Sequence, residues 1–82
     1  MNSPPNDDIT HLVRFETETR YYVALLQVDL FSEWVVSRAW GGKASRLGQQ
    51  RSDLCASREA GLALIEQVRK RRLRRGYKEV GT

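Results

Sequence analysis

The stretch WVVSRAWGG, residues 34–42, decides the fold of this chain. Val35 and Val36 in this stretch are β-branched, and Trp34 and Trp40 are aromatic. Both kinds of residue favour a β-strand, here over residues 34–40. Two adjacent glycines follow, and glycine accepts positive φ at no steric cost. We therefore expect the strand to end at Trp40, with either a sharp reversal of the chain or a close backbone approach at Gly41 and Gly42.

Alternation along this strand separates large side chains from small ones. One face carries Trp34, Val36, Arg38 and Trp40, and the other carries Val35, Ser37, Ala39 and Gly41. Small side chains suit close packing beneath a helix, so we expect the helix on the second face. The first face is then open, with Arg38 lying over an indole. A tryptophan at a strand end is either a core residue or an exposed platform for a ligand, and the residues alone leave both interpretations open for Trp40.

On both sides of this stretch, strand-like patterns alternate with turn-forming residues. The expected elements are strands over residues 10–16, 20–27 and 46–55, a loop over 29–33, a helix over 57–75 and a short edge strand over 77–80. The predicted fold class is α+β: a small antiparallel β-sheet of four to five strands with one long helix packed on it. Residues 1–9 are expected to form a disordered N-terminal tail, and residues 10–80 a single domain.

The predicted helix is bounded by residues that favour its two ends. Ser57 suits the N-cap, and Gly76 suits the left-handed position after the last turn. Basic residues crowd the last turns, from Arg69 to Arg75, where cations complement the negative end of the helix dipole. The apolar positions expected to cover the sheet are Ala60, Gly61, Leu64, Ile65 and Val68.

Charge divides the chain into two unlike halves. Residues 1–33 carry two basic and six acidic side chains, whereas residues 34–82 carry twelve basic and four acidic ones. Such an oriented basic field suits a polyanionic partner, and a merely soluble, arginine-rich surface is the other explanation. Arginine outnumbers lysine, and a guanidinium group binds phosphate through two parallel hydrogen bonds.

The composition argues against several other classes of protein. No apolar run approaches the roughly 20 residues that cross a bilayer, so we expect no membrane segment. Cys55 is the only cysteine, so no internal disulfide can form and a reducing cytoplasm is the expected setting. Because His11 is the only histidine, a zinc site of nitrogen and sulfur ligands cannot be assembled, and we expect no metal or other cofactor. The carboxylate pairs lie in polar segments that lack the burial a catalytic acid needs, so we expect no enzyme.

Four motifs occur in an order that is similar to the WGR domain, a family named for a Trp-Gly-Arg signature. They are QVDLFSEW (residues 27–34), RAWG (38–41), Gly48-Gln49 and RGY (75–77). The resemblance covers residues 11–80 and looks like the stand-alone bacterial branch of the family. It implies a small antiparallel sheet with one helix, as in the poly(ADP-ribose) polymerases that respond to DNA damage.

The resemblance also implies a role for the signature residues. In the polymerases the signature tryptophan packs against the sugar at a DNA end, and Trp40 carries that role by resemblance. No residue stands for the signature arginine, because Gly42 occupies its position and Lys43 is only adjacent.

From residues and resemblance together, we expect a non-catalytic binding module that contacts nucleic acid, DNA above all. Contacts to backbone phosphates and one stacking tryptophan give low sequence specificity. The alternative is a protein-interaction module that uses the Trp34/Trp40 face and binds an acidic protein partner. The residues expected to bind nucleic acid are Arg38, Trp40, Lys43, Arg46, Arg51, Lys70 and Arg74.

Overall fold

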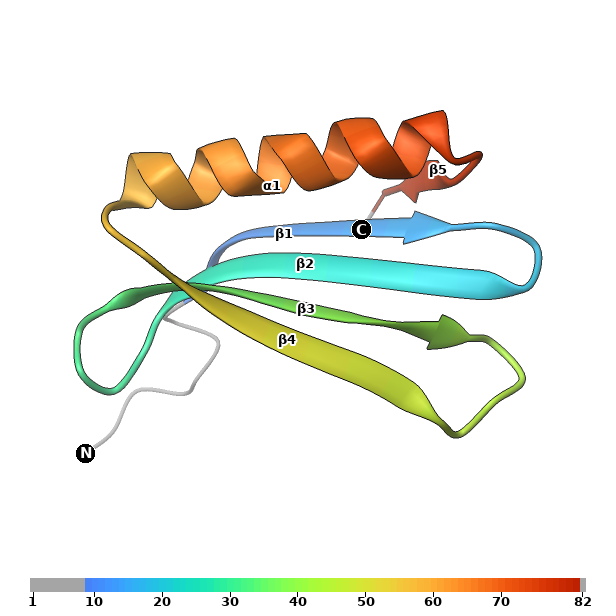
Figure 1. The fold of residues 1–82 in the computed structure, drawn as a ribbon, viewed down its shortest axis with the longest axis horizontal. Helices are drawn as coiled ribbons and strands as arrows, with labels where there is room; N and C mark the ends of the chain where they lie inside the picture. The colour runs from blue at the N-terminus through green and yellow to red at the C-terminus, as the bar shows by residue number, and fades with distance from the viewer. Residues whose placement is uncertain (1–8, 82) are drawn as a thin grey trace.

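The computed structural model describes residues 9–81 and forms two layers, an antiparallel sheet and one helix (Figure 1). The elements are β1 (Ile9–Glu16), β2 (Arg20–Val28), β3 (Trp34–Gly42), β4 (Gly48–Cys55), α1 (Arg58–Arg74) and β5 (Lys78–Val80). The strand order is β4-β3-β2-β1-β5, with β4 and β5 at the edges. The predicted α+β class is confirmed. Of the predicted tail, residues 1–8 lie outside the described residues, and Ile9 already belongs to β1.

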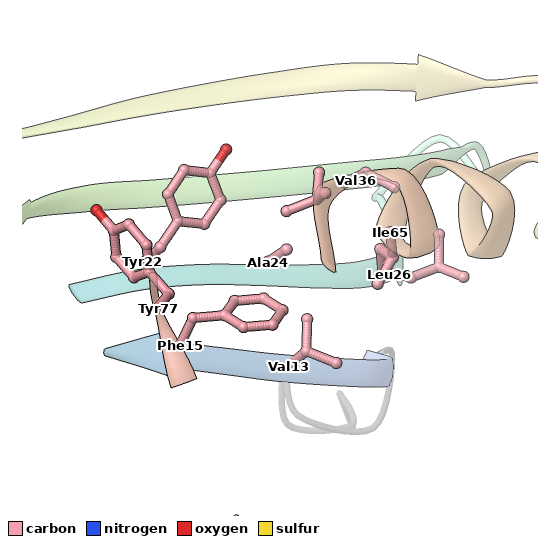
Figure 2. Packing of buried hydrophobic residues seen from close by; sticks show 9 residues of the cluster. Val13, Phe15, Tyr22, Ala24, Leu26, Val36, Ile65 and Tyr77 are labelled. Carbon is pink, nitrogen blue, oxygen red and sulfur yellow. The ribbon is translucent and has the colours of Figure 1, made fainter. Parts of the chain in front are cut away.

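The core lies between α1 and one face of the sheet (Figure 2). Phe15, Leu26 and Val36 are the largest fully buried side chains, and they come from β1, β2 and β3. From α1, Ile65 and Val68 close this core from above. Each of the three central strands thus contributes one apolar face to a common layer, which is what holds the helix on the sheet.

The prediction about the two faces of β3 is wrong. Val36 is fully buried, and Trp34 and Trp40 are half-buried against the same core, so α1 covers the face that carries the tryptophans. The reason lies in the register of β2 on β3, which sets Tyr22 opposite Trp40 and Leu26 opposite Val36. Residues directly opposite each other in an antiparallel pair point to the same side, so the buried face of β2 fixes the buried face of β3.

The predicted end of the strand at Trp40 is also wrong, whereas the alternative expectation of a close backbone approach is confirmed at Gly41. β3 continues through Gly42, and Gly76 is the glycine with positive φ in the described part of the chain. Glycine at position 41 serves close packing instead, because a β-carbon there would lie 3.2 Å from the Tyr21 hydroxyl and 3.3 Å from the Gly48 Cα. β4 consequently starts at Gly48, two residues later than predicted.

The caps of α1 follow the prediction closely. Ser57 Oγ accepts a hydrogen bond from the Ala60 amide at 3.1 Å, which defines the N-cap. At the other end Gly76 has φ 93°, and its amide donates to the Leu73 carbonyl at 3.1 Å. The predicted apolar face is confirmed at Gly61, Ile65 and Val68, whereas Leu64 is half-buried and Ala60 is exposed.

The helix does not span a membrane. The α-helix found among the described residues, α1, has 17 residues. It is neither long nor apolar enough to cross a bilayer.

Candidate nucleic-acid interface

An aromatic cluster stands where β2 and β3 pass beneath the C-terminal half of α1. The rings of Tyr22 and Trp40 are stacked, with centroids 5.4 Å apart and planes 11° from parallel. Tyr77, which follows α1, meets Tyr22 edge-on at 6.5 Å and 80°. Such geometries are the favourable ones for aromatic pairs. Trp40 is therefore held in place on one side and remains half-buried rather than enclosed.

Two arginines are fixed to this cluster. The guanidinium of Arg72 lies 4.5 Å from the centroid of Tyr22 and 5.2 Å from that of Tyr77, a cation–π arrangement with both rings. Arg20 Nε donates a hydrogen bond of 3.3 Å to the Tyr77 hydroxyl. Both cations are thus positioned by aromatic groups, which leave their positive charge unneutralised.

A second basic group lies beside the cluster, on β3 and β4. Arg38 Nη2 donates to Asp53 Oδ2 at 2.6 Å, and Arg51 Nε donates to Asp53 Oδ1 at 3.2 Å. These bonds, the one from Arg38 first, hold the pKa of Asp53 below its usual value. Burial disfavours the charged form of Arg38, but its interactions with Asp53 and Tyr22 together outweigh this and raise its pKa. One carboxylate thus serves two permanent cations, which leaves a net positive charge.

Two adjoining hollows connect these groups into one surface. One, of about 260 Å³, lies between α1 and the Arg38 and Arg51 side chains; the other, of about 480 Å³, lies between α1 and Trp40. They share Tyr22, Arg71 and Arg72 as lining residues. We call this surface the arginine groove, and define it by Arg20, Tyr22, Arg38, Trp40, Arg51, Arg71, Arg72, Arg75 and Tyr77.

The charge of the arginine groove is mostly free. Within residues 9–81, Arg71, Arg72 and Arg75 make no ion pair with a carboxylate. By contrast Arg69, on the other side of α1, pairs with Glu66 at 3.1 Å and with Glu79 at 2.9 Å. One flank of the helix is therefore neutralised and the flank that borders the groove is not.

The structure brings three of the seven predicted binding residues together. Arg38, Trp40 and Arg51 all line the arginine groove. Lys43 lies in the loop after β3, where its Nζ donates to Glu16 Oε1 at 2.9 Å, and Arg46 is exposed in the same loop.

The two predicted helical residues point elsewhere. Lys70 comes two positions after buried Val68, about 200° around the helix. Arg74 has the same relation to Arg72, which faces the groove. Both Lys70 and Arg74 are exposed and belong to neither hollow.

Sequence reasoning missed most of the aromatic and helical members of the groove. For Arg71 and Arg75 a signal existed: they follow Leu64 and Val68 by seven residues each, a spacing that returns to the same side of a helix. For Arg20 and Tyr22 the signal required the register of β2 on β3, which sets Arg20 opposite Gly42 and Tyr22 opposite Trp40.

A third hollow, of about 560 Å³, lies at the β1–β2 turn and is lined by Glu16, Glu18 and Lys78 among others. With two carboxylates at its rim, it is a poor place for a polyanion. Among the described residues, no group of three or more His, Cys, Asp or Glu side chains could hold a metal ion.

A small antiparallel sheet under one helix, with a basic groove at their junction, defines a small domain of the α+β class. Comparison with known families agrees with this description. The chain belongs to the WGR family, because the sequence model of the WGR domain matches residues 9–82. Neither a search of curated proteins nor a search of solved structures returned a match.

Proposed function

We propose that the chain is a non-catalytic module that binds nucleic acid, DNA above all, in the arginine groove. The observation that carries the proposal is that Arg71, Arg72 and Arg75 border the same hollow as Trp40 and have no described carboxylate partner. Unpaired guanidinium groups beside an aromatic side chain suit a phosphate backbone with a sugar or base against the ring.

The groove favours binding with little sequence preference. Contacts to phosphates position a protein on nucleic acid but carry no sequence information. Reading of bases in the major groove usually requires a helix or ribbon that enters it, and the middle of α1 is committed to covering the sheet through Ile65 and Val68. We therefore expect duplexes of unrelated sequence to bind with similar affinity.

The position of Arg20 supports the same surface. Gly42 stands where the family signature has arginine, and Arg20 lies directly opposite Gly42 in the β2–β3 ladder. Arg20 also lines the hollow beside Trp40. A guanidinium is thus supplied at this end of the groove from the neighbouring strand.

The protein-interaction alternative is less well supported by the geometry of the Trp34/Trp40 face. It needed an open face with Trp34 and Trp40, and α1 covers that face. An acidic protein that occupies the arginine groove stays a testable rival, since it would use the same cations without a nucleotide.

The decisive experiment compares two pairs of charge changes on the same helix. Isothermal titration with a blunt DNA duplex at several salt concentrations gives both the affinity and the slope of log K against log salt. We expect R71Q/R75Q to weaken binding and to reduce the steepness of the slope by roughly two units, about 0.9 for each lost phosphate contact.

The matched control is K70Q/R74Q, which removes the same charge from the outward side of α1. It should leave the slope nearly unchanged. Equal effects of the two pairs would mean that the protein senses only net charge, and wild-type binding that is absent or insensitive to salt would contradict the proposal.

A further inference from the structure

β4 is an edge strand that carries two charged side chains, Arg51 and Asp53, but lacks several other common protections. It pairs with β3 along its whole length and has no partner on its other side among the described strands. Its sequence, GQQRSDLC, contains no proline and no lysine, and its register with β3 runs from Trp34–Cys55 to Gly41–Gly48 without a bulge. Natural proteins usually use such devices to stop an edge from pairing with another chain.

Two large apolar side chains stand at the two ends of this edge. Leu47, just before β4, is 85% exposed, and Leu54, near its end, is 68% exposed. A strand that pairs with the free edge of β4 would cover part of this apolar surface. Antiparallel pairing would place the start of one β4 beside the end of another, so Leu54 would lie along the contact and Leu47 near its end.

The charges of β4 select one register for pairing with a second copy. In a symmetric pair, the residue at the two-fold axis (the dyad) is opposite its own copy. If Arg51 or Asp53 lies at the dyad, two like charges face each other, which destabilises the pair. If the dyad lies at Ser52, Arg51 of each copy is directly opposite Asp53 of the other. The strand is then complementary to itself, and the favourable charge pair occurs twice.

We propose that β4 pairs with β4 of a second copy of this chain, antiparallel and with Ser52 opposite Ser52. The dimer is then isologous, as most homodimers are, and the two sheets become one. Directly opposite residues of two antiparallel strands point to the same side of the sheet. Because Arg51 of one copy and Asp53 of the other are opposite each other, the two copies have their helices on the same face of the joined sheet. The two arginine grooves therefore open on the same side, on either flank of the paired β4 strands. The pairing itself does not depend on nucleic-acid binding.

The first test measures the mass of the protein in solution without nucleic acid. Light scattering behind size exclusion, over a roughly hundredfold range of protein concentration, should show about twice the 9.5 kDa of one chain at the high end. Ser52→Lys should shift the protein to the mass of one chain, because it places two like charges on the dyad.

Thr19→Lys, in the exposed β1–β2 turn, adds the same charge away from the edge and should leave the dimer intact. Circular dichroism checks that both variants are folded. Wild-type protein that stays at 9.5 kDa throughout, or Ser52→Lys protein that stays dimeric, overturns the proposal.

The second test fixes the register. Directly opposed residues of antiparallel strands have Cα atoms about 4.5–5.5 Å apart, which a disulfide can span. In a Cys55→Ala background, Ser52→Cys should therefore form a covalent dimer under mild oxidation. Gln50→Cys, whose position faces Leu54 of the second copy, should not. Crosslinking at position 50 with none at position 52 overturns the Ser52 register.

Discussion

Trp40 belongs to the core and to the candidate interface at once. Its ring stacks on Tyr22, which is buried, and it also lines the hollow beside Arg71 and Arg75. The two interpretations that the residues left open, core residue or platform, are therefore not exclusive: one side of the residue is used in packing and the rest borders open space.

Replacing this ring should separate the two roles. We expect Trp40→Ala to weaken binding of a DNA duplex by about 1–3 kcal/mol, the range measured for contacts between aromatic side chains and bases. The protein should remain folded, because the fully buried core of Phe15, Leu26 and Val36 is untouched. Trp40→Phe keeps an aromatic ring and should lose less affinity. Titration calorimetry and thermal unfolding measure the two effects, and an unfolded Trp40→Ala protein would assign the residue to packing alone.

Gly42 offers a second test at the scale of one residue. A β-carbon at position 42 would meet Ser45 Cβ at 3.6 Å and the Thr19 carbonyl at 3.8 Å, which are ordinary contacts. Gly42→Arg should therefore fit sterically, and it places a guanidinium directly opposite Arg20, a like-charge pair that costs some stability. We expect tighter DNA binding and a salt slope steeper by up to about one unit.

The control for this change is Gly42→Ala, which adds the β-carbon without the charge and should bind like the wild-type protein. Gly42→Arg should also restore affinity in an Arg20→Ala background, since either guanidinium can reach the same end of the groove. If arginine and alanine at position 42 behave alike in both backgrounds, DNA does not approach Trp40 from this side.

At the scale of elements, the close approach of α1 to β2 depends on one glycine. A β-carbon on Gly61 would collide with a terminal methyl group of Leu26, whose side chain is fully buried. Glycine is otherwise a poor choice within a helix, about 1 kcal/mol worse than alanine. The presence of glycine at position 61 indicates that close packing of α1 on β2 stabilises the protein more than better helix propensity would.

Gly61→Ala should therefore destabilise the protein, by about 1–3 kcal/mol for overpacking, despite the gain in helix propensity. Urea unfolding measures the change. In a Leu26→Ala background the collision disappears, and the same substitution should become neutral or stabilising. A stabilising Gly61→Ala in the wild-type background would show that the helix lies farther from β2 than described.

At the scale of the whole molecule, two carboxylates link strands of the sheet and the β3–β4 loop and make stability depend on acid. Hydrogen bonds from Lys43 and Arg14 lower the pKa of Glu16, and those from Arg38 and Arg51 lower the pKa of Asp53. Each contributes stability that is fully present above the unfolded pKa of about 4 and is lost as the pH falls through the lower folded value.

We accordingly expect the free energy of unfolding to fall as the solution is acidified below about pH 4. Asp53→Asn removes one of the two groups and should make this fall shallower, while its amide oxygen still accepts from Arg38. Urea unfolding across a pH series gives the comparison. Identical pH profiles for the two proteins would mean that Asp53 has the same pKa in the folded and unfolded chain.

Local signals in the sequence were enough for the elements of this fold. The β-branched run at Val35 and Val36, the cap at Ser57 and the glycine at position 76 placed β3 and both ends of α1 nearly where the structure has them. Parity along β3 also grouped Trp34, Val36, Arg38 and Trp40 correctly. It could not decide which group faces the helix, because that depends on Tyr22 and Leu26 of another strand.

The candidate site shows the same limit. Arg38, Trp40 and Arg51 could be found because they share a side of neighbouring strands. Arg20 and Tyr22 could not, since their place in the groove follows from pairing with β3. Lys70 and Arg74 were chosen by charge alone, and the phase of the helix, already readable from Val68, would have placed them outside the arginine groove.

The placement of the two tryptophans gives the protein an optical reporter of its own. Trp34 and Trp40 lie at opposite ends of β3, and Trp40 borders the arginine groove. A nucleotide that stacks against Trp40 would quench its fluorescence and leave the emission of Trp34 unchanged. A Trp34→Phe protein would carry a single emitter inside the groove, so occupancy could be followed with unlabelled nucleic acid at protein concentrations far below those that calorimetry needs.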